Sequence, residues 1–366
     1  MFYKFICKQR TFHYLICGIV IFCYMNNAQS SDAFPEFGSL HVGGNPYSVV
    51  VNSITNKVYV TTEQENQVWI LNSTDNNVIT TVNVTGFPEG IAIDLEKNKI
   101  YTTMYGIGGT GNTVKVINGT TNKVIKIITV GTGPVGIGVN PKTDKIYVAN
   151  SGAGTISVIN STIDEVLKTI TIPNMTESES EPLDVGVNIK NNKIYVANDK
   201  DNSVSIINGT IDKVIKIIKV GINPQGVGID PINNKVYISN YLDGSISTID
   251  STTDEIIKTI TVGTGPVGIG VNPKTDKIYV ANSGAGTISV IDGNDDKVVY
   301  TIPLGNSPSW IAVNNITNTI YVVNYGAGTM TVIPDISIQK IPEFGSFVTE
   351  ISIIGIVGVF IIQRHS

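Results

Sequence analysis

Carboxylates and tyrosines in short segments between apolar runs are the side chains of this chain best suited to bind a ligand. Carboxylate oxygens bind hard cations, and aromatic rings stack on other flat groups. We take as candidate ligand-binding residues Tyr105, Glu177, Glu179, Glu181, Asp199, Asp201, Tyr241 and Asp243. No Asp-x-Asp-x-Asp-Gly loop accompanies them, so a calcium site, sugar stacking and ordinary solvated loops are all open alternatives.

Side chains for nucleophilic and acid–base chemistry are scarce. Of three histidines, only His41 lies within the region 39–335, and the three cysteines, Cys7, Cys17 and Cys23, all precede residue 29. The body therefore has no disulfide, thiolate metal site or cysteine nucleophile. We expect no catalytic residues, no metal site and no cofactor.

The charge of the chain argues against nucleic acid as its partner. The net charge is −5, and the first 28 residues contain Lys4, Lys8 and Arg10 but no acid, so the remainder is more acidic than the whole. Binding to phosphates needs clustered lysine and arginine, whereas the lysines here stand singly beside Asp or Asn in turns.

A repeated pattern positions these residues. Pro-x-Gly, Lys-φ-Tyr-Val-x-Asn and Thr-φ-Ser-Val-Ile (φ, apolar) recur in order, and the copies open at Pro46, Pro88, Pro134, Pro182, Pro224, Pro266 and Pro308. A period of about 40–50 residues with several short strands indicates a propeller or a solenoid. In the copy that begins at Pro266, strands are expected at 267–271, 277–281, 287–291 and 298–302, which makes a four-stranded blade.

The ends of the repeat region predict a closed ring. The seventh copy stops after Ile333, one strand short, while residues 40–46 align without gaps on residues 260–266, the end of a fourth strand. The N-terminal strand should complete blade seven and leave no open edge. We predict an all-β, seven-bladed β-propeller of four-stranded antiparallel blades over residues 39–335, with Gly136, Gly138, Gly268 and Gly270 near the crowded axis.

Two insertions and one duplication bear on where a site lies. The segments 104–112 and 173–182 lengthen loops at the same end of the channel in neighbouring sectors, and long loops often carry function; neutral drift is the alternative. Residues 130–159 and 262–291 are identical, so we do not expect a unique site residue there.

The N-terminal segment has the pattern of an export signal. Residues 1–28 combine a basic start with an apolar run, and cleavage is expected after Ala28 or Ala33, with a linker over 29–38. An uncleaved membrane anchor is the alternative.

The C-terminal segment has the pattern of a sorting signal. A linker, 336–346, contains Pro342, Glu343, Phe344 and Gly345, and an apolar transmembrane or sorting segment follows over 347–366. This order resembles the PEFG-type sorting signals of archaeal exported proteins. The resemblance implies processing by an archaeosortase-type enzyme and attachment to the membrane or cell surface.

The strand pattern Lys-Ile-Tyr-Val-Ala-Asn, at 145–150, 193–198 and 277–282, resembles the YVTN-type β-propeller repeats of archaeal surface-layer proteins. That resemblance implies a structural, adhesive or binding role in the cell envelope, with envelope proteins or glycans as partners. Some relatives resemble a haem-binding propeller, which would need axial ligands and a c-type partner, and no Cys-x-x-Cys-His motif occurs here. Propeller lyases and lactonases also resemble this shape; they rely on His–Glu pairs or on metal carboxylates, and the histidines are absent.

Sequons for N-glycosylation occur at Asn72, Asn83, Asn118, Asn160, Asn174, Asn208 and Asn315. Export would permit glycans, but Asn-Gly-Thr is also favourable turn chemistry, so both interpretations stand. The sequence thus favours an exported, surface-anchored, non-catalytic propeller. The alternative is an exported enzyme, or a small-ligand or cation-binding propeller, with an acidic site at the channel end that bears the long loops.

Overall fold

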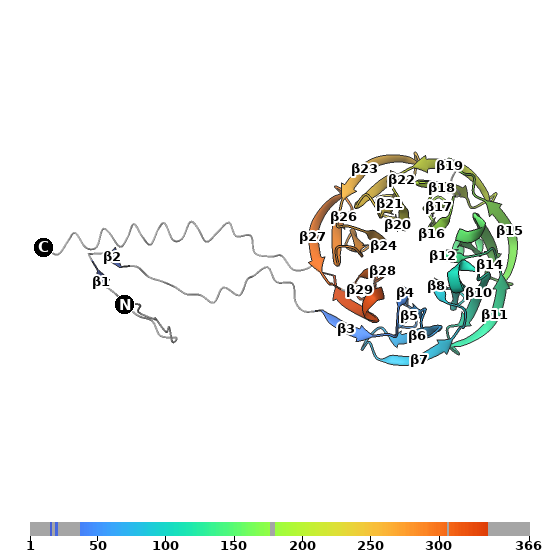
Figure 1. Ribbon diagram of the computed structural model, residues 1–366, viewed down its shortest axis with the longest axis horizontal. Helices are drawn as coiled ribbons and strands as arrows, with labels where there is room; N and C mark the ends of the chain where they lie inside the picture. Colours follow the sequence, from blue (N-terminus) through green and yellow to red (C-terminus); the bar gives the residue numbers. More distant parts are fainter. Residues whose placement is uncertain (1–14, 17–18, 21–36, 176–179, 306, 336–366) are drawn as a thin grey trace. The chain divides into compact units, whose positions relative to one another are not determined.

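A computed structural model describes residues 15–16, 19–20, 37–175, 180–305 and 307–335. Over residues 38–334, seven four-stranded antiparallel sheets are arranged as blades around a central axis (Figure 1). The predicted seven-bladed β-propeller is therefore confirmed. Within each blade the first strand lies innermost and the fourth forms the rim.

The blades follow the repeats. Blade one contains β4 (Pro46–Asn52), β5 (Lys57–Thr62), β6 (Gln67–Asn72) and β7 (Val78–Asn83), and blade two β8 (Pro88–Asp94), β9 (Lys99–Met104), β10 (Thr113–Asn118) and β11 (Lys123–Thr129). Blade three contains β12 (Pro134–Asn140), β13 (Lys145–Asn150), β14 (Thr155–Asn160) and β15 (Glu165–Thr171), and blade four β16 (Pro182–Asn188), β17 (Lys193–Asn198), β18 (Ser203–Asn208) and β19 (Lys213–Lys219). Blade five contains β20 (Pro224–Asp230), β21 (Lys235–Asn240), β22 (Ser245–Asp250) and β23 (Glu255–Thr261), and blade six β24 (Pro266–Asn272), β25 (Lys277–Asn282), β26 (Thr287–Asp292) and β27 (Lys297–Pro303).

Blade seven is built from both ends of the repeat region. It contains β28 (Pro308–Asn314), β29 (Thr319–Asn324), β30 (Thr329–Pro334) and, as its outer strand, β3 (Gly38–His41). The register pairs Gly38 with Val332 and Leu40 with Met330. The predicted closure by the N-terminal strand is thus confirmed, and it gives β30 a hydrogen-bonded neighbour on its outer side.

Elements outside the strands of the blades are short. The 3₁₀ turns η1 (Ile107–Gly109), η2 (Pro141–Thr143), η3 (Ser151–Ala153) and η4 (Tyr325–Ala327) lie in loops. The strands β1 (Leu15–Ile16) and β2 (Ile19–Val20) pair with each other in a separate unit. Within the described residues we find no helix of the length and apolarity that a membrane crossing needs. The predicted sorting segment lies outside the described residues.

Tight turns explain the clusters of Asn and Asp between strands. The turn between the first and second strands of each blade contains one residue with a positive φ, for example 53° at Asn56 and 52° at Asp144. Asn and Asp tolerate this left-handed conformation better than other non-glycine residues. The recurring turn residues therefore set the register of every hairpin.

The core lies between adjacent blades. One tyrosine on the second strand of every blade is fully buried, at Tyr59, Tyr101, Tyr147, Tyr195, Tyr237, Tyr279 and Tyr321. Tyr147 of blade three belongs to an apolar cluster that also contains Val185 and Ile194 of blade four. A single blade cannot bury this surface, so each depends on its neighbour.

Close approach of backbones around the axis explains the innermost glycines. A Cβ atom on Gly136 would lie 2.3 Å from the carbonyl oxygen of Leu183 in the next blade, and one on Gly268 would lie 2.4 Å from that of Ser309. No side chain fits at such distances. The prediction that these glycines lie where the backbones crowd is confirmed.

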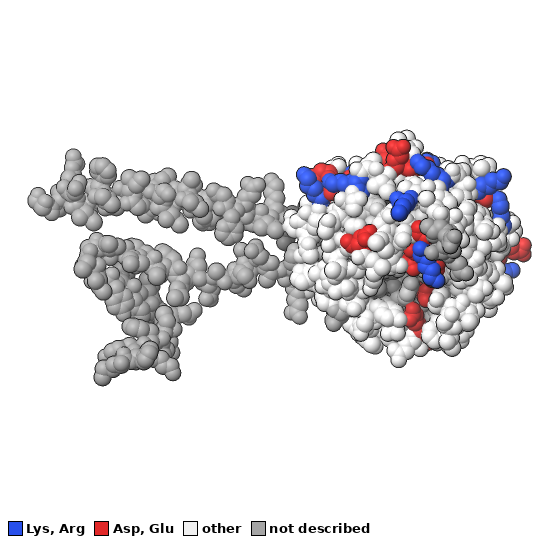
Figure 2. Space-filling view, turned by 45° about the horizontal axis from the view of Figure 1, so that its top comes forward, with Lys and Arg blue, Asp and Glu red and all other residues white. Residues whose placement is uncertain are grey.

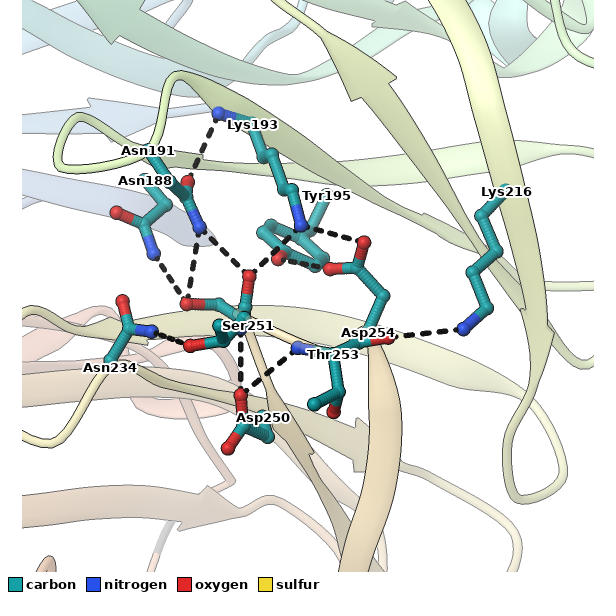
Figure 3. A network of polar contacts seen from close by, with 11 residues as sticks. Asn188, Asn191, Lys193, Tyr195, Lys216, Asn234, Asp250, Ser251, Thr253 and Asp254 are labelled. Atoms are coloured by element: carbon teal, nitrogen blue, oxygen red, sulfur yellow. Dashed lines mark hydrogen bonds and ion pairs between the residues drawn. The ribbon is translucent and has the colours of Figure 1, made fainter.

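A polar network links blade four to blade five on the face opposite the long loops (Figure 3). The Lys193 Nζ atom of blade four lies 2.6 Å from Asp254 Oδ2 of blade five, and the Tyr195 hydroxyl donates to Asp254 Oδ1 at 3.0 Å. Lys193 also donates to the Ser251 carbonyl at 3.0 Å. We call this Lys–Tyr–Asp arrangement the latch. It recurs at Lys99–Tyr101–Asp164, Lys145–Tyr147–Asp212 and Lys235–Tyr237–Asp296.

The latch changes on both sides of blade one. Asn122 takes the place of the aspartate that would face Lys57, and the two side chains lie 2.9 Å apart. Thr319 takes the place of the lysine in blade seven, where the Tyr321 hydroxyl donates to the Ser73 carbonyl at 3.1 Å. The first of these junctions has a hydrogen bond from a charged lysine to a neutral amide, and the second has a neutral hydrogen bond, each beside apolar packing.

We predict that the N-terminal strand is required for a stable ring. A variant that begins at Gly44 loses β3 and the fully buried Val42, whose burial contributes about 1.5–3 kcal/mol. It should unfold at a lower temperature and aggregate through the exposed edge of β30. A variant that begins at residue 37 keeps the strand and serves as the control. Equal unfolding midpoints for the two variants would contradict this role.

We also predict that the latch is stabilising. The variant Asp254→Asn leaves Lys193 without its carboxylate and should lower the free energy of unfolding by roughly 2 kcal/mol. Asp295→Asn is the control, because Asp295 is half exposed and pairs with Lys297 on the surface, where a pair contributes little. Urea unfolding would measure both, and a similarly small effect for the two variants would contradict the prediction.

Candidate functional site

The central channel opens between acidic and aromatic side chains on the face that carries the long loops. Figure 2 shows acidic atoms in a hollow near the middle of one face of the ring. We call this set of residues the mouth. It comprises Tyr47, Glu63, Glu89, Tyr105, Glu181, Asp184, Asp199, Lys200, Gln225, Trp310 and Tyr325.

The innermost strands place several of these residues by departing from the repeat. Blades three and six open with Pro-Val-Gly, whereas the corresponding segments of other blades read Pro-Tyr-Ser from Pro46, Pro-Glu-Gly from Pro88, Pro-Leu-Asp from Pro182 and Pro-Ser-Trp from Pro308. The pairing register shifts directly after each of these prolines. The same shift follows the opening proline of the other blades, so the departures occupy equivalent positions of the innermost strands and gather at one end of the channel.

Aromatic side chains of blades one and seven form one wall of the mouth. The rings of Tyr47 and Trp310 stack with centroids 5.5 Å apart and planes at 24°, and Tyr325 meets Tyr47 edge-on at 6.5 Å. The Tyr325 hydroxyl donates to Glu63 Oε2 at 2.8 Å. Each of these residues is partly exposed, so the wall presents apolar faces beside a carboxylate.

Glu89 on β8 is the most deeply buried acid of the mouth. Its residue is 8% exposed. Burial raises the pKa of its carboxyl to about 8, the nearby charge of Glu63 adds to the rise, and a hydrogen bond from Tyr47 acts in the opposite direction. Among the described residues no basic side chain offsets the burial, so a substantial share of this carboxyl is protonated at neutral pH.

Asp184 on β16 faces the aromatic wall across a small cavity. Its Oδ2 atom accepts a hydrogen bond from the Val227 amide at 2.9 Å. Burial raises the pKa of Asp184 to about 6, although backbone hydrogen bonds oppose the rise. Tyr47, Asp184 and Trp310 together line a cavity of about 20 Å³, which is enough for one water-sized group.

Asp199 and Glu181 form the opposite side of the mouth. Asp199 Oδ1 accepts hydrogen bonds from the side-chain amides of Asn223 and Gln225. Burial, together with the charge of Glu181, raises the pKa of Asp199 to about 6, although the Gln225 hydrogen bond and the charge of Lys200 oppose the rise. Glu181 pairs with the exposed Lys200 at 2.6 Å.

Tyr105 connects the two sides. Burial raises the pKa of its hydroxyl, and the charges of Glu89 and Glu181 contribute to that rise. Tyr105 opens the long loop of blade two, and Glu181 ends the long loop before blade four. One residue of each insertion, Tyr105 and Glu181, is thus close enough to the other for their charges to interact.

The remaining predicted site residues have other positions. Asp201 is buried and accepts hydrogen bonds from the Met175 amide and the Ser203 hydroxyl, at 3.0 and 2.9 Å to its Oδ2 atom. Asp243 accepts from the Ile222 amide at 2.6 Å. Both aspartates fix loops. Tyr241 is 37% exposed, and Glu177 and Glu179 lie outside the described residues.

The sequons have defined places in turns. Asn72, Asn118, Asn160 and Asn208 each end the third strand of a blade, and the side-chain oxygen of each accepts a backbone N–H two residues later at 2.8–2.9 Å. Asn83, Asn174 and Asn315 are exposed. Asn83 accepts in the same way from the Thr85 amide at 3.2 Å. The turn chemistry is therefore present at these five sequons, and glycosylation stays a prediction.

The described acids of the mouth stand apart from one another. Among the described residues, no three His, Cys, Asp or Glu side chains converge as metal ligands. The carboxyls are instead spaced around the aromatic wall. Their chemistry suits recognition of a positively charged or hydrogen-bonding group larger than a single ion.

Sequence reasoning missed Glu89, Asp184 and Tyr47 as candidates. Each replaces a small or apolar residue of the repeat in an innermost strand, and that departure was the available signal. A departure from the repeat can be recognised as part of a site only in the closed ring, because closure brings blades one, two, four and seven to a common channel end.

Comparisons with known proteins support the fold. A family model described as a YNCE-like beta-propeller matches residues 172–318. The fold is similar to Kuenenia stuttgartiensis hydrazine synthase, with a TM-score of 0.71, 18% identity, and coverage of 80% of this chain and 96% of that one. It is also similar to virginiamycin B lyase from Staphylococcus aureus, with a TM-score of 0.68, 17% identity, and coverage of 81% and 98%. No curated protein matches the sequence.

We predict that burial of Glu89 makes the protein less stable as the pH rises. The unfolded chain releases this proton near the ordinary pKa of 4.5, but the folded protein holds it until about pH 8. The free energy of unfolding should therefore fall between these values. Between pH 6 and 8 the loss should be about 2 kcal/mol.

The variant Glu89→Gln should remove this loss, whereas Glu165→Gln, at an exposed position, should retain it. Thermal and urea unfolding at several pH values would measure the difference. Parallel pH profiles for the wild type and Glu89→Gln would show that Glu89 ionises normally in the folded protein.

Proposed function

We propose that this protein is an exported, surface-anchored propeller that acts as a non-catalytic binding module of the cell envelope through its mouth. The observation that carries the proposal is the gathering of departures from the repeat at one channel end. Elsewhere in the ring the same positions serve packing and turns. At the mouth they present half-buried acids beside stacked aromatic rings, a combination typical of recognition surfaces.

Export and retention complete the proposal. The basic and apolar start at residues 1–28 supports export, and the Pro342–Gly345 motif followed by an apolar segment supports retention at the surface. An archaeosortase-type enzyme would process the C-terminal segment, as the resemblance implies. The partners we propose are envelope proteins or glycans that meet the mouth.

A catalytic role is the alternative, and one observation favours it. Glu89 and Asp184 have pKa values raised to about 8 and about 6. Two carboxyls with separated pKa values near neutrality suit a general acid and a general base. One of the similar folds is a lyase, so an exported enzyme with an acidic site is the second candidate.

Intact cells test the proposed function. Deletion of residues 342–366 should release the propeller into the medium, and the full-length protein should be accessible to antibody at the surface. The mouth variant Glu63→Gln/Asp199→Asn should then lose capture of envelope material, while Asp295→Asn retains it. Cytoplasmic full-length protein, or equal capture by both variants, would overturn the proposal. Substrate turnover lost in Glu89→Gln would favour the enzyme.

A further inference from the structure

We propose that the mouth binds a primary ammonium group on an aliphatic chain, held between the stacked rings of Tyr47 and Trp310 and the carboxyls of Glu89 and Asp184. This inference deepens the proposed function and rests on it, because it names the chemical class that the binding module recognises.

The charge of the mouth is not balanced by its own side chains. The acids are Glu63, Glu89, Glu181, Asp184 and Asp199. Among the described residues, the one basic side chain whose charge acts on them is Lys200. Lys200 is exposed and lies 2.6 Å from Glu181, on the side away from the aromatic wall. Five acids therefore share one nearby base, and a cationic ligand would supply the missing charge.

Glu89 is an independent sign of a ligand. More than nine-tenths of the residue is buried, yet its neighbours are the Tyr47 hydroxyl and the like charge of Glu63 rather than a cation. A buried carboxyl without a cation is costly to ionise. A bound ammonium would offset that cost, so the site is organised for a positive group that the protein does not provide.

The aromatic wall selects an organic cation over a metal ion. Cations bind favourably over the faces of tryptophan and tyrosine, and the Tyr47–Trp310 pair stands beside the acids with centroids 5.5 Å apart. The described acids do not converge as metal ligands. An alkylammonium fits both the aromatic rings and the separated carboxyls, because its alkyl chain packs on the rings while its ammonium group contacts the carboxyls.

The cavity limits the size of the head group. Tyr47, Asp184 and Trp310 line a space of about 20 Å³, which admits a group the size of water. A primary ammonium has this size, and its N–H donors can bind the Asp184 carboxylate that lines the cavity. A trimethylated ammonium is larger and has no donors, so it should bind more weakly.

Protonation of Glu89 should lower the affinity for an alkylammonium. The groups that face it are the Tyr47, Tyr105 and Tyr325 hydroxyls and the Glu63 carboxyl. The tyrosine hydroxyls are neutral below pH 9, because burial raises their pKa values. An alkylammonium stays charged over the same range, so a rise in affinity from pH 6 to 9 would report ionisation of the mouth acids.

Calorimetry on the purified full-length protein tests the proposal, with n-butylammonium chloride as the probe. We expect saturable binding that tightens about tenfold from pH 6 to pH 9 and releases protons. Glu89→Gln should match the wild type at pH 6 and bind about tenfold more weakly at pH 9. Asp184→Asn should weaken binding at both pH values, whereas Asp295→Asn should leave it unchanged.

Further probes define the ligand class. Tetramethylammonium and calcium chloride should bind at least tenfold more weakly than butylammonium. Tetralysine, compared with 1,4-diaminobutane, distinguishes a lysine side chain of a protein partner from a free amine. Calcium binding without butylammonium binding would overturn the inference, as would butylammonium binding that neither Glu89→Gln nor Asp184→Asn changes while both variants remain folded.

Failure of the ammonium proposal can be distinguished from failure of the proposed function. If envelope capture depends on the mouth but butylammonium does not bind, the binding module stands and the ammonium class is wrong. If butylammonium binds as predicted but cells show no surface display, the ligand class stands and the envelope role is wrong.

Discussion

Contact between neighbouring blades is the constraint on which the rest of this structure depends. A four-stranded blade has two apolar faces and cannot bury either alone, so the ring must close before any blade is complete. The buried second-strand tyrosines provide much of the packing at each junction. The hydroxyls of four of them also take part in the latch, which joins Lys193 and Tyr195 of one blade to Asp254 of the next.

The junctions are not equivalent, and the difference follows the path of the chain. Complete latches link blades two to six in succession. The junctions on either side of blade one lack the aspartate or the lysine, and blade seven borrows β3 from the N-terminus. The ring is thus closed by strand pairing and apolar packing, where the ionic part of the latch is absent.

The same crowding that orders the ring also confines the mouth. Near the axis, neighbouring backbones leave room for glycine alone at positions such as Gly136 and Gly268. Larger residues occur near the start of an innermost strand, at the end of the channel, as at Asp184 and Trp310. A repeat scaffold can carry a distinct site only at such departures, and this chain concentrates acids and aromatic rings there.

The sequence predicts the scaffold better than the site. The Pro-x-Gly period, the turn residues and the alignment of residues 40–46 on residues 260–266 define the blades and their closure. They do so because each signal is local and repeated. The environment of Glu89 is neither local nor repeated. Its neighbours Tyr47 and Glu63 belong to a different blade, and it is buried only when the two blades meet. The loop residues Tyr105, Glu181 and Asp199 were recognised because insertions and charge are visible in the sequence.

The central claim is that ring closure creates a mouth whose deepest acid lacks a compensating charge. The most direct test is a titration of the Glu89 carboxyl in the folded, full-length protein. Isotope-edited infrared or carbon NMR spectroscopy, assigned with Glu89→Gln, would follow its ionisation. The account predicts a midpoint of about 8, and an ordinary midpoint near 4.5 would contradict it.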